Sequence, residues 1–236
     1  PAPATCDGGD DGGSDGGSGA LGAPFDSYHY VVTIKMEVEG ADGGLVGGDI
    51  EGDFVAPGSH AWRQTFAFGG LSFDESYVII GEDAWYREGD GDWQAKSADD
   101  PVIADGTDLT SADPEFFNDP SFVEDIRAFD STKEEKNGVS TRKYEFSKDS
   151  FDELSALLGE DLLGDTDIED LVDFSMEIWI DDETDTLIAA DLTASTSGEG
   201  LADFPVDVPE GGSVTVKMAI NVTQINDDSI SIEPPI

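Results

Sequence analysis

The stretch Ser27–Glu39, which reads SYHYVVTIKMEVE, alternates apolar and polar side chains with a strict period of two. Successive side chains of an extended chain point to opposite faces, so the apolar positions share one face. These positions are Tyr28, Tyr30, Val32, Ile34, Met36 and Val38. The opposite face carries polar residues, among them His29, Lys35 and Glu37, and the pattern therefore predicts a long, half-buried β-strand.

Further stretches repeat this alternation along the chain. They are 49–55 (DIEGDFV), 59–68 (SHAWRQTFAF), 139–147 (VSTRKYEFS), 174–181 (FSMEIWID), 186–196 (TLIAADLTAST) and 213–225 (SVTVKMAINVTQI), with two short strands expected within 76–94. Glycine-rich or acidic turns separate the strands of the first half. Short turns join neighbouring antiparallel strands, so these strands are expected to form a meander.

The middle of the chain changes to a helical period. Asp119 and Pro120 form an N-cap and first-turn pair before apolar residues spaced three or four apart. Ser150 and Glu153 match a capping box that opens a helix over 150–158, and a further helical piece is expected over 167–173. Strands followed by helices and again by strands predict an α+β fold, a large antiparallel sheet with helices on one side.

The charge of the chain limits its partners. It has 236 residues with 54 acidic and 11 basic side chains, a formal net charge of −43. Binding of nucleic acid requires Lys and Arg to neutralise phosphates, so nucleic acid is excluded as a partner. Adsorption of the domain to anionic lipid is excluded for the same reason. A protein adapted to high salt and an ordinary acidic extracellular protein both fit this composition.

The N-terminal residues 1–24 differ from the rest of the chain. They contain Cys6, the only cysteine, and residues 7–24 carry eight glycines and four aspartates with one large apolar side chain. Such a segment buries too little apolar surface to offset its ordering entropy, which predicts a flexible tether before a single domain over 25–236. Cys6 is interpreted as an attachment point behind a removed targeting segment, the alternative being an unmodified thiol. No apolar run of about 18 residues is present to form a membrane-spanning helix.

Several of these segments together resemble the LolA-like superfamily of bacterial extracytoplasmic lipoproteins, in particular its LppX/LprG-type members. They are YHYVVTIKMEVEG, IEGDFVAPGSHAW, YVIIGEDAWYREGDGDW, FSMEIWIDDETDTLIAADL and VTVKMAINVTQIND, and they lie within 25–230. The resemblance implies a curved, half-open antiparallel barrel with helices over its concave side. It also implies a cavity for a lipid or acylated molecule, a lipidated Cys6, and a location at the cell surface or in the periplasm, with an envelope protein as a further partner.

In such a fold the cavity would lie between the sheet and the helices. The candidate lining residues are Ile34, Met36, Trp62, Phe66, Phe68, Phe122, Ile126, Leu154, Leu158, Met176 and Ile178. Each of them fits an ordinary core position equally well, because the alternation identifies the face of a strand and not the space beside it.

No catalytic constellation is found in the sequence. His29 and His60 both lie in strand patterns, and neither a Gly-x-Ser-x-Gly sequence nor a phosphate loop is present. The acidic stretches DGGDDGGSDGG and DDETD miss the spacing of a calcium-binding EF-hand loop. The sequence therefore predicts no catalytic residue, metal or cofactor.

Two functions stay open on this basis, with an enzyme acting on envelope polymers as a third. The first is a non-enzymatic, membrane-anchored carrier that binds acyl chains in an apolar cavity. The second is an envelope interaction or sensing module of the same fold whose core is filled by side chains. An apolar cavity of several hundred Å³ would favour the carrier.

Overall fold

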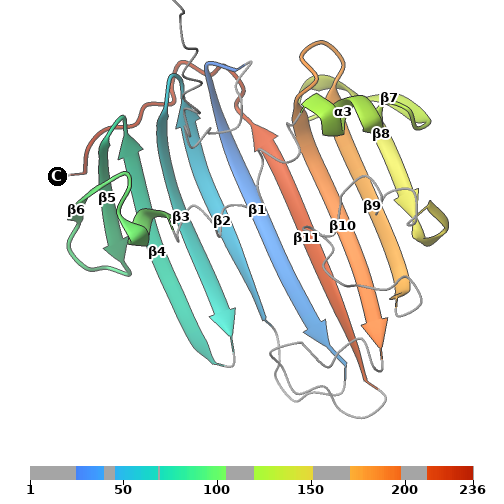
Figure 1. The fold of residues 1–236 in the computed structure, drawn as a ribbon, viewed down its shortest axis with the longest axis horizontal. Coiled ribbons are helices and arrows are strands. Elements are labelled where there is room, and N and C mark those ends of the chain that lie inside the picture. The colour runs from blue at the N-terminus through green and yellow to red at the C-terminus, as the bar shows by residue number, and fades with distance from the viewer. Residues whose placement is uncertain are drawn as a thin grey trace, which may run out of the picture.

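The computed structural model describes residues 25–39, 46–68, 70–104, 120–150, 171–197 and 212–235. Within them the chain forms an 11-stranded antiparallel sheet (Figure 1). The strands are β1 (Ser27–Val38), β2 (Val46–Val55), β3 (Ser59–Phe68), β4 (Leu71–Ile80), β5 (Asp83–Glu88), β6 (Gln94–Ser97), β7 (Ser131–Lys136), β8 (Val139–Ser147), β9 (Leu171–Asp181), β10 (Leu187–Ser197) and β11 (Ser213–Thr223). The helix α3 (Pro120–Ile126), the 3₁₀ turn η1 (Lys148–Ser150) and a helical turn at 101–104 accompany the sheet.

The sheet consists of two meanders joined through the first and last strands. Its order is β6-β5-β4-β3-β2-β1-β11-β10-β9-β8-β7, so β1 pairs with β2 on one side and with β11 on the other. The sheet is curved and does not close, and β6 and β7 are its edges (Figure 1). The predicted large antiparallel sheet is thereby confirmed.

Several strand limits differ from the expectation. β2 begins at Val46 and not at Asp49, and β4 begins at Leu71, well before the predicted start at Ser76. The first residues of β4 were not predicted as part of a strand. Two of them, Leu71 and Phe73, are large apolar residues that lie exposed. The edge strand β7 was not predicted because its sequence, STKEEK, has no apolar alternation. Charged side chains on such an edge oppose pairing with another chain.

The helical piece expected over 167–173 is wrong for its last residues. Leu171–Asp173 begin β9, where Leu171 lies opposite Thr196 and Asp173 opposite Ser195. The intervening Val172 is therefore an extra residue, a β-bulge. The bulge places the buried Leu171 and Phe174 three residues apart, which imitates the spacing of a helix. Residues 151–170 lie outside the described residues, and so does most of the helix expected over 150–158.

The core lies on one face of the sheet, here called the inner face. A cross-strand row of this face runs through β8, β9, β10, β11, β1, β2 and β3, and each of its residues is at most 1% exposed: Tyr144, Ile178, Ala190, Ile220, Val32, Ile50 and Gln64. Val123 and Ile126 of α3 belong to the same core cluster, and Figure 1 shows α3 near the ends of β9 and β10. The outer face is polar and carries ion pairs such as Arg63 with Asp74.

Candidate functional site

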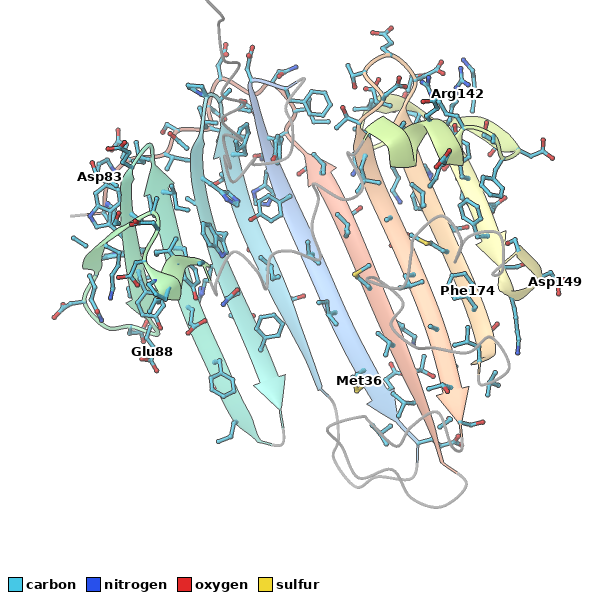
Figure 2. All side chains as sticks on the ribbon, in the orientation of Figure 1. Met36, Asp83, Glu88, Arg142, Asp149 and Phe174 are labelled. Atoms are coloured by element: carbon cyan, nitrogen blue, oxygen red, sulfur yellow. The ribbon has the colours of Figure 1, made fainter. Side chains whose placement is uncertain are left out.

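Next to the buried row, the inner face becomes partly accessible while staying apolar. Leu192, Met218, Ile34, Gly48 and Phe66 follow one another across β10, β11, β1, β2 and β3. The side chains of Leu192, Met218, Ile34 and Phe66, and those of Ala194, Val216 and Met36 in the row beyond, are half-buried. Met176 and Phe174, which continue these two rows in β9, are buried. We call this region the apolar face: Ile34, Met36, Phe66, Leu192, Ala194, Val216 and Met218. Figure 2 shows Met36 towards the end of β1.

Gly48 makes the apolar face continuous between β1 and β3. A Cβ atom at this position would lie 2.3 Å from Cδ1 of Phe66 and 2.3 Å from the carbonyl oxygen of Thr65. The absent side chain therefore leaves the space that the Phe66 ring occupies over β2. An apolar surface that is accessible on the inside of a curved sheet is suited to holding acyl chains.

Beside the apolar face, aromatic rings form a series across β1 to β5. Consecutive ring centroids lie 4.6–6.3 Å apart in the order Phe54, Tyr28, Tyr30, His60, Trp62, Tyr77 and Tyr86. Gly52 permits this arrangement, because a Cβ there would lie 2.6 Å from the hydroxyl oxygen of Tyr30. Stacked and tilted rings at such distances stabilise the fold beyond the burial of their area.

His60 is a neutral member of this series. Its Nε2 atom lies 2.7 Å from the Tyr30 hydroxyl, and its ring contacts the rings of Tyr30 and Trp62. Burial lowers the pKa of His60 to about 4 and raises the pKa of Tyr30 well above its usual value. The pair is thus uncharged at neutral pH, and its contacts are those of a core hydrogen bond.

The His60 environment predicts a pH-dependent stability. The His60 imidazole is protonated near pH 6.5 in the unfolded state but only near pH 4 in the folded state. The free energy of unfolding therefore falls as the pH is lowered through this range. Between pH 7.5 and pH 5.0 the loss from this group is expected to reach about 2 kcal/mol. Urea unfolding at both pH values measures it, and His60→Gln should remove this part of the loss. The control His29→Gln should retain it, and an equal loss in both variants would contradict the assignment.

A polar cluster interrupts the inner face where β3, β4 and β5 meet. The Glu75 carboxylate accepts hydrogen bonds from Gln64 Nε2 at 2.7 Å, from the Tyr77 hydroxyl at 3.0 Å and from the Tyr86 hydroxyl at 3.0 Å. Burial and the bond to Glu75 raise the pKa of Tyr86 to about 12, so this phenol stays protonated as a donor. Trp62 Nε1 and Gln64 Oε1 are buried beside the cluster and have no hydrogen-bond partner among the residues that the structure describes.

The structure places the predicted lining residues in two groups. Ile34, Met36 and Phe66 are half-buried on the apolar face, whereas Trp62, Ile126, Met176 and Ile178 are buried in the core cluster. The side chains of Phe68 in β3 and Phe122 in α3, together with Leu154 and Leu158, lie outside the described part of the chain, as does Cys6. The lining role of the four apolar residues and the lipid attachment at Cys6 stay predictions.

The polar cluster was not predicted from the sequence. Gln64 was visible as a polar residue on an apolar strand face, which is the one signal for it in the sequence. Glu75 gave no signal, because it lies in the part of β4 that was not predicted as a strand. The cross-strand positions Met218 and Leu192 were assigned to strands but not to a site.

The carboxylates of the acidic turn DDETD (181–185) bond to its own backbone and to basic side chains of neighbouring strands. Asp181 Oδ1 accepts the backbone N–H groups of Glu183 at 2.6 Å and Thr184 at 2.8 Å. Lys133 and Arg142 both bond to Asp182 and lower the pKa of its carboxyl. Among the described residues, no group of three or more His, Cys, Asp or Glu side chains could hold a metal ion.

The chain is similar in fold to LprF from Mycobacterium bovis, with 14% identity, 90% of each chain covered and a TM-score of 0.38. It is also similar to a LolA superfamily protein from Nitrosomonas europaea, with 10% identity, 84% of this chain and 87% of that chain covered and a TM-score of 0.24. A DUF1329 family protein from Desulfovibrio piger has 10% identity, 88% coverage of both chains and a TM-score of 0.24.

No family model and no curated protein matches the sequence.

Proposed function

We propose that this protein binds a lipid or another acylated molecule on the apolar face and carries or presents it at a membrane. The observation that carries this proposal is that, from β10 to β3, a fully buried row on the inner face gives way to an apolar row whose side chains are half-buried. A sheet that only needed a core would gain by covering these side chains, because exposed apolar area costs roughly 25 cal/mol per Å². A ligand with acyl chains would supply that cover.

In this proposal helices cover the concave side of the sheet and enclose the ligand. Val123 and Ile126 support this arrangement, since both residues of α3 belong to the core cluster of the inner face. The candidate lining residues in the remaining predicted helix, Leu154 and Leu158, would contribute to the same cover.

The proposal places the protein outside the cytoplasm and anchored through a lipidated Cys6. The segment from Cys6 to Phe25 would span roughly 25 Å as a flexible chain, which clears the lipid head groups. No helix in the described part of the chain is long and apolar enough to cross a membrane. An acidic domain held at this distance avoids contact with anionic lipid, and an envelope protein would load or unload it.

We propose a non-enzymatic role, with a filled-core interaction or sensing module as the second candidate. The second candidate is favoured by Met176 and Ile178, which were expected to line a cavity and are at most 2% exposed. A module of this kind would recognise an envelope protein with its surface and leave the inner face closed.

Organic extraction and mass spectrometry of the full-length protein, purified from a lipid-containing host, separate the two candidates. Lipid at a molar ratio near one is expected for the carrier and would identify its acyl chains. Protein that contains no lipid and also fails to bind fluorescent fatty-acid and phospholipid probes would overturn the carrier and favour the interaction module.

A polar substitution on the apolar face is expected to weaken binding. Ile34→Asn places an amide in the centre of the apolar row, and the affinity for a fluorescent fatty acid should fall about tenfold, the equivalent of about 1.4 kcal/mol. Thr33→Asn is the matched control, because Thr33 is the adjacent residue of β1 on the outer face. Equal affinities of the two variants in a fluorescence titration would contradict the assignment of the apolar face.

A further inference from the structure

Beside the polar cluster lie a hydrogen-bond donor and an acceptor that no group of the described residues satisfies. Trp62 Nε1 is an N–H donor and Gln64 Oε1 is an acceptor, both are buried, and neither has a hydrogen-bond partner. Trp62 is 3% and Gln64 is 1% exposed, and both side chains extend from the inner face of β3. Leaving such groups unpaired costs about 1–3 kcal/mol each.

The orientation of the Gln64 amide is determined by its neighbours. Its Nε2 donates to Glu75 Oε2 at 2.7 Å and to the Tyr77 hydroxyl oxygen at 3.3 Å. A carboxylate only accepts hydrogen bonds, so turning the amide would set its oxygen against the carboxylate of Glu75. The oxygen of Gln64 is therefore left as an acceptor, two residues from the Trp62 donor on the same strand face.

One chemical group matches both atoms. A hydroxyl accepts one hydrogen bond and donates another, so it is the uncharged group whose chemistry would satisfy both the Trp62 N–H donor and the Gln64 acceptor. An anionic group would be repelled by two carboxylates. Glu75 lies in the cluster, and Glu88 lies directly opposite Glu75 on β5. The one basic side chain that the register places on this face of β3 to β6, Lys96, pairs with Asp100 at 3.6 Å.

We infer that Trp62 and Gln64 form a binding site for an uncharged, hydroxyl-bearing group of the bound lipid. The inference rests on the proposed function and adds the chemical class of the head group and its place. The apolar face begins one row away, where Phe66 is the next inner-face residue of β3 after Gln64. A ligand with its hydroxyl group at Trp62 and Gln64 would have the apolar face one row away for its acyl chain.

The test compares probes that have the same acyl chain and different head groups. The full-length protein, freed of lipid, is titrated with 1-monooleoylglycerol, methyl oleate and oleate in competition with a fluorescent fatty acid. The inference predicts that monooleoylglycerol binds about tenfold more tightly than methyl oleate, which has the ester and lacks the hydroxyl groups. Oleate, which is anionic, is expected to bind no better than methyl oleate.

Variants assign this preference to the two side chains. Trp62→Phe keeps a ring and removes the N–H group, and Gln64→Met removes the amide at similar length. Each should lower the affinity for monooleoylglycerol about five- to tenfold and change that for methyl oleate less than twofold. Trp85→Phe is the matched control, since Trp85 lies on the outer face of β5.

The two proposals fail in different ways in this experiment. Equal binding of monooleoylglycerol and methyl oleate by the unmodified protein would overturn the hydroxyl site and leave lipid binding intact. The same holds if both probes lose affinity equally in Trp62→Phe and in Gln64→Met. Absence of binding by all three probes would overturn the proposed function and this inference together.

Discussion

Replacing Gly48 by alanine is expected to lower the free energy of unfolding by about 3 kcal/mol, the effect of overpacking a rigid site. The added Cβ would lie 2.3 Å from the carbonyl oxygen of Thr65 and 2.3 Å from the ring of Phe66. The oxygen belongs to the backbone of a central strand, so it cannot move without disturbing the pairing of β2 with β3. Urea unfolding followed by tryptophan fluorescence measures the change.

Two further variants show whether this clash is the cause. Asp49→Ala changes the next residue of β2, which is exposed on the outer face, and it should alter stability by less than about 0.5 kcal/mol in 1 M KCl. The double variant Gly48→Ala, Phe66→Ala should show a coupling energy of about 1 kcal/mol, because it removes one of the two clashes. A Gly48→Ala protein with unchanged stability would contradict the close packing of β2 against Phe66.

Raising the salt concentration is expected to stabilise the protein strongly. Between 0.1 M and 1 M KCl the melting temperature should rise by about 10 °C or more, because the screening length falls from about 10 Å to about 3 Å. The net charge of −43 supplies the repulsion that salt screens. On β2 the carboxylates of Asp49, Glu51 and Asp53 recur at every second residue of the outer face, at a spacing of roughly 6–7 Å.

The screening of charge repulsion has to be distinguished from the other effects of salt on stability. Sucrose at the same osmolality stabilises a folded protein by exclusion from its surface and leaves its charges unscreened. It should therefore raise the melting temperature much less than KCl does. Equal effects of KCl and sucrose in differential scanning calorimetry would show that charge repulsion does not limit the stability of this fold.

The sequence was most informative where a residue's neighbours along the chain decide its position. The alternation within 27–39 and 213–225 correctly assigned the inner-face residues of β1 and β11, such as Val32 and Ile220. It failed at Leu171–Asp173, because a bulge in the pairing with β10 shifts the period. It also failed for β7, which is held by pairing with β8 and has no apolar face of its own.

The candidate site was predictable only in part. Ile34, Met36 and Phe66 were named from the alternation and lie on the apolar face. Trp62, Met176 and Ile178 share the same inner face but are buried, a difference that depends on which side chains of distant strands lie over them. The hydrogen bonds of Gln64 and Tyr86 to Glu75 join three strands and follow from cross-strand register.

The sequence by itself determined the large antiparallel sheet and the two faces of its strands, and its charge predicts which partners are excluded. The strand faces follow from the alternation of side chains, which depends only on neighbours along the chain. The net charge is a sum over the whole sequence and needs no knowledge of the fold. The tertiary structure alone decided that β1 pairs with β11, that the buried row gives way to the apolar face, and that Trp62 Nε1 and Gln64 Oε1 have no hydrogen-bond partner among the described residues. Each of these depends on contacts between residues far apart in the chain, whose register no local pattern specifies.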